Sequence, residues 1–335
     1  MSAITEHITP ASHSPGHMVS SGGLPSPSRT RLASPSAAPL DRLQLTVMRR
    51  IDGLLAGDHS GLLPGHGTER GEARPYVPGD DPRHIDWAVT ARTGDPHVRD
   101  TISDHELEVW IVFDASASTA FGTGLSTKHE LAWSAAGAFA LLAGRGGNRI
   151  GAIRSSAHHG HFTPARSGRN HIAALLAGLR REPEDGDDAA LGTALEKLRR
   201  TARRRGLVVV VSDFHGDTSW ERPLRALATR HEVIAVQVSD QREFELPDVG
   251  LLAVVDPETG RRRLVDTSDA SMRFRYAELA SGRQAALAAR LGSLGADHLV
   301  LRTDRDWVFD LVRFVSSRRR RRSAARPRAA APTRT

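Results

Sequence analysis

Short apolar runs alternate with longer amphipathic stretches along the chain from Glu106 onward. Such runs, rich in β-branched residues, are typical of buried strands in a parallel sheet. We predict strands at Glu108–Phe113, Arg149–Ser155, Leu207–Ser212, Val233–Val238 and His298–Arg302. We predict helices at Thr127–Arg145, Asn170–Arg181, Ala190–Arg205, Ser219–Arg230, Ser271–Leu294 and Asp306–Arg318. This order predicts an α/β fold, a doubly wound and mostly parallel sheet flanked by helices.

One pair of strands breaks the alternation. Leu251–Val255 and Arg263–Val265 flank the turn-forming segment Asp256–Gly260. A β-hairpin inserted before the long helix is the expected result.

The remaining sequence divides the chain into segments. Residues 1–39 are rich in Ser, Pro and Gly, and we predict that they are disordered. Residues 40–105 begin with an amphipathic helix at Leu40–Leu55, continue as a small irregular segment, and are predicted to pack on the main domain at 106–316. Residues 317–335 are predicted to form a disordered, Arg-rich tail.

Composition limits the classes of function. The chain has no cysteine, which excludes disulfides and Cys-based zinc or redox sites. It shows neither a transmembrane segment nor a signal-peptide pattern, so we predict a cytoplasmic protein. The nine arginines from Arg313 onward exceed the net charge of +7, which leaves the rest slightly acidic. Nucleic acid is therefore not expected as the main ligand, although the tail is either simply solvated or binds an anionic surface weakly.

Oxygen-bearing side chains stand where predicted strands end. Asp114, Ser116 and Ser118 follow the first strand, and Asp213 follows the strand at Leu207–Ser212. Thr193, preceded by a glycine, lies at the start of a helix. Ligands bind at the carboxyl ends of strands in open α/β sheets, and oxygen-only ligands suit a hard cation such as Mg²⁺. Each residue taken singly is also explained as a turn or a helix cap.

The spacing of these residues resembles a known site. Asp-x-Ser-x-Ser at 114–118, Gly-Thr at 192–193 and Asp213 are similar to the metal-ion-dependent adhesion site of von Willebrand factor A domains. The resemblance implies that Asp114, Ser116, Ser118, Thr193 and Asp213 hold Mg²⁺, or another divalent cation such as Mn²⁺ or Ca²⁺. It also implies that a partner's Asp or Glu completes the coordination.

A second block resembles the bacterial domain of unknown function 58 family. It runs from Arg74 to Trp87, through Pro-Gly-Asp-Asp-Pro-Arg, and continues to Gly94. The family joins this block to a von Willebrand A-like domain and is commonly encoded beside MoxR-type AAA+ ATPases. Pro75 departs from the family's usual Arg-Glu. Arg83, Asp86 and Arg92 either form a structural ion-pair network or present charge beside the cation.

These observations predict a non-enzymatic, metal-dependent protein-interaction module. The implied partner is a MoxR-type AAA+ ATPase or its client. One alternative is a Mg²⁺-dependent phosphoryl-transfer enzyme, but Ser116 stands where phosphatases of the haloacid-dehalogenase type carry a second acid. The other alternative is binding of an anionic surface or nucleic acid through the Arg tail. The segment from Gly122 to Lys128 lacks the spacing of a phosphate-binding loop and is predicted to be a flexible loop near the metal.

Overall fold

The computed structural model describes residues 73–77, 82, 85–99, 107–155, 160–181, 190–255 and 261–325. The predicted disorder of residues 1–39, the helix at Leu40–Leu55 and the turn at Asp256–Gly260 lie outside these residues. Among the residues described, none of the helices combines the length and apolar character that a membrane crossing needs.

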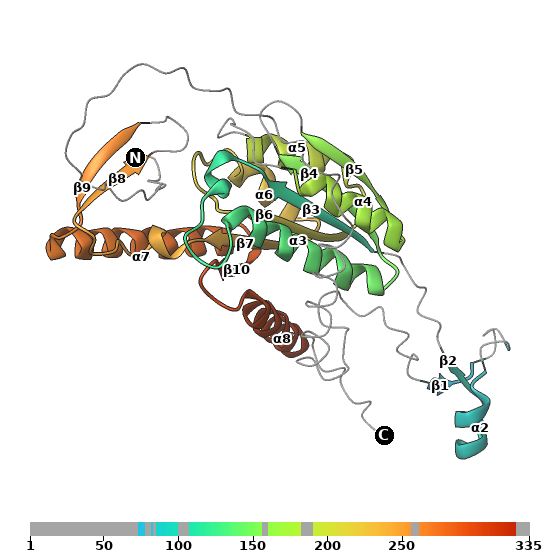
Figure 1. Ribbon diagram of the computed structural model, residues 1–335. Coiled ribbons are helices and arrows are strands. Elements are labelled where there is room, and N and C mark those ends of the chain that lie inside the picture. The colour runs from blue at the N-terminus through green and yellow to red at the C-terminus, as the bar shows by residue number, and fades with distance from the viewer. Residues whose placement is uncertain are drawn as a thin grey trace, which may run out of the picture.

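A six-stranded sheet forms the centre of the molecule (Figure 1). Its strand order is β10-β7-β6-β3-β4-β5. The first five strands in that order pair in parallel, and β5 joins the edge antiparallel to β4. The bounds are β3 Glu108–Asp114, β4 Arg149–Ser155, β5 His161–Arg166, β6 Gly206–Ser212, β7 Glu232–Ser239 and β10 Ala296–Arg302. All five predicted strands are confirmed, and the sequence analysis missed β5, in which only one of the six residues is buried.

Helices cover both faces of this sheet, which confirms the doubly wound α/β prediction. Val109, Ile111 and Phe113 of β3 belong to a core shared with one set of helices. Trp110 and Val112 point to the opposite face and belong to a second core. The first set comprises α3 Lys128–Arg145, α4 Arg169–Leu179 and α8 Trp307–Ala325; the second comprises α5 Ala190–Thr201, α6 Glu221–Ala228 and α7 Ala270–Ser293. This alternation explains why β3 is buried along its whole length.

The inserted hairpin is confirmed. β8 (Leu251–Val255) pairs antiparallel with β9 (Arg262–Asp266). Figure 1 shows that one end of α7 extends beyond the sheet, and the hairpin lies beside this end.

The prediction of a disordered tail from residue 317 is wrong for residues 317–325. Helix α8 continues to Ala325 and includes the run of five arginines. Arg318 is buried, and its guanidinium bonds Asp297 at 2.6 Å and Glu232 at 2.9 Å. These two carboxylates stand at the amino ends of β10 and β7, so the first arginine of the run completes the fold.

The Pro-Gly-Asp-Asp block contributes a small separate element. Strands β1 (Ala73–Pro75) and β2 (His97–Arg99) pair antiparallel, and α2 (Trp87–Thr93) lies between them in sequence. Asp86 caps α2 by accepting hydrogen bonds from the main-chain N–H groups of residues 88 and 89. This supports a structural role for Asp86, while Arg83 lies outside the described residues. Figure 1 shows β1, β2 and α2 apart from the six-stranded sheet, and packing of the block on the main domain stays a prediction.

Candidate metal and partner site

The reversal of strand order places the site between β3 and β6. From β3 the chain first builds β4 and β5 on one side, then returns to build β6, β7 and β10 on the other. A crevice forms at such a switch point, outside the carboxyl ends of the strands. Asp114 ends β3 and Asp213 directly follows β6, so both carboxylates stand at this point. Both side chains are buried.

The loop after β3 folds around the Asp114 carboxylate. One oxygen, Oδ1, accepts a hydrogen bond from the main-chain N–H of Ser116 at 3.0 Å. The other, Oδ2, accepts one from the Ser212 hydroxyl at 2.6 Å, which ties the end of β3 to the end of β6. The hydroxyl oxygens of Ser116 and Ser118 lie 3.0 Å apart. Asp114, Ser116 and Ser118 thus lie together at the end of β3.

Asp213 joins this group from the neighbouring loop. The Ser118 side chain lies near its carboxylate and helps to lower the pKa of Asp213. Phe214, the next residue, has a φ of 55°, an uncommon left-handed conformation for a bulky side chain. Its N–H donates to the Ser212 hydroxyl at 2.8 Å. The turn therefore fixes the direction in which Asp213 faces.

The two carboxylates have opposite pKa shifts. Burial, together with the nearby charge of Asp213, raises the pKa of Asp114. Burial also disfavours the charged form of Asp213, but the positive charges of Lys128 and His215 outweigh it and hold the pKa of Asp213 well below its ordinary range. Asp213 is the permanently charged member of the pair.

Lys128 is a site residue that the sequence analysis did not identify. It is the first residue of α3, and its side chain is fully buried. Its Nζ donates to Asp213 Oδ2 at 2.8 Å and to Glu243 Oε1 at 2.5 Å. Burial lowers the pKa of Lys128, but these two carboxylates outweigh that effect and raise it above the ordinary lysine value. Lys128 is therefore an ammonium ion inside the site.

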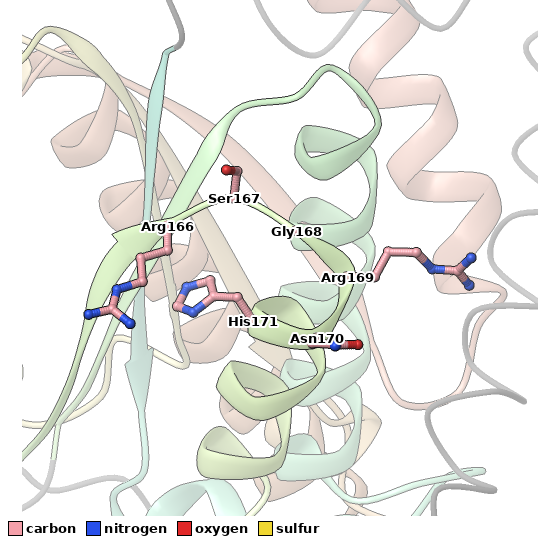
Figure 2. Close-up of a pocket in the computed structure, with 6 residues that line it drawn as sticks. All are labelled: Arg166, Ser167, Gly168, Arg169, Asn170 and His171. Carbon is pink, nitrogen blue, oxygen red and sulfur yellow. The ribbon is translucent and has the colours of Figure 1, made fainter.

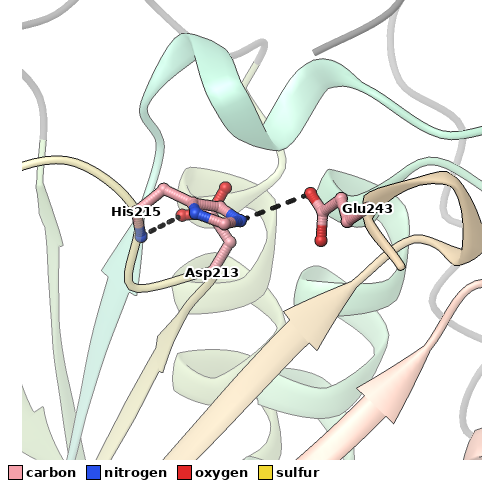
Figure 3. A group of neighbouring side chains, drawn as sticks. All are labelled: Asp213, His215 and Glu243. Atoms are coloured by element: carbon pink, nitrogen blue, oxygen red, sulfur yellow. Dashed lines mark hydrogen bonds and ion pairs between the residues drawn. The ribbon is translucent and has the colours of Figure 1, made fainter. Parts of the chain in front are cut away.

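His215 and Glu243 form a second group with Asp213 (Figure 3). The main-chain N–H of His215 donates to Asp213 Oδ1 at 3.1 Å, and the imidazole Nε2 of His215 lies 3.5 Å from Glu243 Oε1. Burial lowers the pKa of His215, but the carboxylates of Asp213 and Glu243 outweigh it and raise the pKa. The three side chains have ligand atoms within 4.8 Å of one another, as a metal site requires. However, Lys128 already bonds the carboxylates of Asp213 and Glu243, so the negative charge of this group is largely neutralised without a metal ion.

Thr193 lies near the start of α5. Helix α5 begins at Ala190, so Thr193 lies within its first turn and is exposed. It lines a hollow between α5 and α6 together with Glu196, Ser219 and Arg222. None of the other four predicted ligands lines this hollow. Asp114, Ser116, Ser118 and Asp213 thus lie close together, and Thr193 as a fifth ligand stays a prediction.

The four gathered residues fit a small divalent cation. Adjacent ligands of an octahedral Mg²⁺, each about 2.1 Å from the ion, are about 3.0 Å apart. The hydroxyl oxygens of Ser116 and Ser118 have this separation. With Asp114 and Asp213 they would supply an incomplete shell for such an ion, which leaves positions for water or a ligand from outside.

A third strand end supports the site from the side. Asp240, which directly follows β7, is buried and accepts hydrogen bonds from the N–H and the hydroxyl of Thr123 at 2.8 and 2.6 Å. It also accepts one from the Thr303 hydroxyl at 2.5 Å. These bonds fasten the loop before α3 to the ends of β7 and β10. The loop from Gly122 to Lys128, which was predicted to be flexible, is held at these strand ends by hydrogen bonds, and its Leu125 side chain is 88% exposed. Its position near a metal ion stays a prediction.

The hollow in Figure 2 belongs to a different region. It is lined by residues 166–171, at the turn from β5 into α4. Because β5 is antiparallel, this turn stands at the edge of the sheet opposite the carboxyl ends of the parallel strands. None of the predicted ligands lines it.

Comparison with known proteins identifies the family. The family model described as "Protein of unknown function DUF58" matches residues 72–286. An uncharacterized protein of Mycobacterium tuberculosis is 49% identical over 286 residues, which cover 85% of this chain and 90% of that protein. The chain belongs to the DUF58 family.

Two further kinds of similarity were found. An uncharacterized protein in the moxR 3' region of Paracoccus denitrificans is 37% identical over 94 residues, covering 28% of this chain and 89% of that protein. BatB from Bacteroides thetaiotaomicron is similar in structure, with 15% identity, a TM-score of 0.43, and coverage of 64% of this chain and 99% of that one. The SpRpn10 VWA domain has 12% identity and a TM-score of 0.32, over 62% of this chain and 94% of that one.

Proposed function

We propose that this chain is a non-enzymatic protein-interaction module that binds a partner's carboxylate through a divalent cation, first of all Mg²⁺. Asp114, Ser116, Ser118 and Asp213 would hold the ion. When bound, the ion supplies an open coordination position for an Asp or Glu of the partner. The observation that carries this proposal is the gathering of these four oxygen-bearing side chains at the switch point of the sheet.

The surroundings of the site support docking of a protein. Leu125 projects into solvent from the loop before α3, while the backbone of that loop is held by bonds to Asp240 and to the Thr303 carbonyl. An exposed leucine on a fixed loop supplies apolar contact area beside the polar site. The hydroxyls of Ser116 and Ser118 bond each other, the Ser212 hydroxyl donates to Asp114, and His215 Nε2 pairs with Glu243. Neither arrangement activates a nucleophile, which favours binding over phosphoryl transfer.

We propose a MoxR-type AAA+ ATPase, or a client of it, as the partner. The Paracoccus relative's position in a moxR 3' region supports this choice. An exposed Asp or Glu of the partner would supply a carboxylate oxygen, the type of ligand that a hard divalent cation prefers, to the open coordination position.

The test is binding of the MoxR-type ATPase encoded in the same genome, measured by biolayer interferometry in millimolar Mg²⁺ and again in EDTA. EDTA and Ser116→Ala should each weaken binding at least tenfold, because EDTA removes the ion and the substitution removes one of its proposed ligands. Ser116 is only half-buried, so its replacement should leave the fold intact. Thr201→Ala is the matched control, because it also removes one hydroxyl but lies exposed at the last residue of α5. Unchanged binding in EDTA would overturn the proposal.

A further inference from the structure

Lysine is rare in this chain, and its placement is unusual. Of the 46 lysines and arginines, only Lys128 and Lys197 are lysines. Lys197 is exposed on α5. Lys128 is fully buried inside the candidate site. Nearly all the other cationic side chains are arginines, yet a lysine occupies the position between the carboxylates of Asp213 and Glu243.

The contacts of Lys128 explain why lysine is needed there. Its Nζ lies between Asp213 of the loop after β6 and Glu243 of the short helical turn after β7. Lysine presents a compact point charge, whereas arginine carries a planar fork that needs more width. The buried first turn of α3 delivers this point charge without exposing it to water.

We infer that the Lys128 ammonium is a resident cation of the site, which shares Asp213 with the divalent ion and limits how tightly that ion binds. This inference rests on the proposed function. Asp114, Asp213 and Glu243 bring three carboxylates, and Lys128 offsets one of them. A fixed positive charge bonded to a ligand of the ion repels that ion. The ion therefore binds weakly to the chain alone, and a partner's carboxylate supplies the negative charge that Lys128 removes.

Mn²⁺ binding to the isolated protein tests this inference without any partner. Free Mn²⁺ is measured by electron paramagnetic resonance with wild type, Lys128→Met, the double variant Lys128→Met/Glu243→Gln and Lys197→Met. Methionine has the length of the lysine stem without its charge. The double variant also removes one carboxylate, so its site has the same net charge as wild type.

Lys128→Met should bind Mn²⁺ at least tenfold more tightly than wild type. The double variant should return to within about threefold of wild type, because charge rather than shape sets the affinity. Lys197→Met should match wild type. Thermal unfolding of each variant confirms that the folded protein is being compared, and the lysine ¹³C measurement described below, which keeps Lys128 in place, tests the inference if Lys128→Met does not fold.

The outcomes separate this inference from the proposed function. Equal Mn²⁺ affinity in wild type and Lys128→Met overturns the role of Lys128 and leaves metal-dependent docking standing. A double variant that binds as weakly as wild type while Lys128→Met binds tightly supports it. If no variant binds Mn²⁺, both proposals are overturned.

The two lysines also allow a direct spectroscopic reading. Protein labelled with ¹³C at lysine Cε should give two signals, assigned with Lys197→Met. Saturating Mg²⁺ should move the Lys128 signal and leave the Lys197 signal in place. A Lys128 signal that does not move overturns the shared site.

Discussion

Replacing Asp240 with asparagine should destabilise the protein and loosen the loop that carries Leu125. Each oxygen of the Asp240 carboxylate accepts one main-chain N–H and one hydroxyl. Oδ2 accepts from the main-chain N–H of Thr123, and Oδ1 accepts from the main-chain N–H of Arg242. An asparagine must turn its NH₂ group toward one of these two N–H donors, and two donors form no bond. The hydroxyls can rotate to adapt, but a main-chain N–H has no such freedom.

The magnitude follows from this geometry. One buried N–H left without an acceptor costs about 1–3 kcal/mol. Bonds to a charged carboxylate are about twice as strong as those to a neutral amide, so the remaining bonds also weaken. We expect Asp240→Asn to lower the free energy of unfolding by about 2–4 kcal/mol. The assay is urea denaturation followed by tryptophan fluorescence.

Asp304→Asn is the matched control. Asp304 lies at the same edge of the sheet but is partly exposed and pairs with Arg302. A surface ion pair of this kind contributes about 0–1 kcal/mol. If Asp240→Asn changes the free energy of unfolding by no more than Asp304→Asn, the reasoning about the buried carboxylate is refuted.

The pH dependence supplies a second check on Asp240. Burial disfavours its charged form, but the hydrogen bonds from Thr123 and Thr303 outweigh burial and lower the pKa of Asp240 below its ordinary value of 3.8. A lowered folded-state pKa gives stability that is present above the unfolded value and lost as the pH falls through the folded value. Between about pH 5 and pH 2, wild type should therefore lose more stability than Asp240→Asn.

Two further predictions concern the fold. Gly206→Ala should lower the free energy of unfolding by about 1–3 kcal/mol in urea titrations, because an added Cβ would lie 1.9 Å from the Glu108 carbonyl oxygen on the neighbouring strand. Gly282→Ala on α7 has open space around it and should instead stabilise slightly; equal effects would contradict the close approach. Removing the residues after 317 should lower the melting temperature, since it deletes Arg318 and its bonds to Asp297 and Glu232, whereas removing only the residues after 325 should not. Identical melting temperatures for the two truncations would show that this part of α8 adds no stability.

Much of the architecture followed from local pattern. Apolar runs and amphipathic stretches placed five strands and six helices because strand burial and helix amphipathicity leave distinct periodicities. The partly exposed edge strand β5 has no such continuous apolar run and was missed. The arginine run was misassigned because its composition resembles a solvated tail, while the acids that bind Arg318 lie 21 and 86 residues away in sequence.

The site shows the same division. Asp114 and Asp213 were recognisable because each comes directly after a buried strand, and Asp240 follows a predicted strand in the same way. Thr193 was predicted as a ligand from its position near a helix start, but the direction of its side chain depends on where in the first turn of the helix it lies. Ser212 could have been suspected from its position at the end of β6, since it faces Asp114 across the switch point.

The sequence by itself determined the alternation of strands and helices, the positions of the strand-end carboxylates and the family motif, because these depend on neighbours in the chain. Only the tertiary structure decided which charges meet. Lys128 bonds Asp213 and Glu243, which are 85 and 115 residues away, and nothing in the local pattern around Lys128 indicates either contact. The sheet's strand order brings these three loops to one edge, and burial there makes the pairing of their charges necessary.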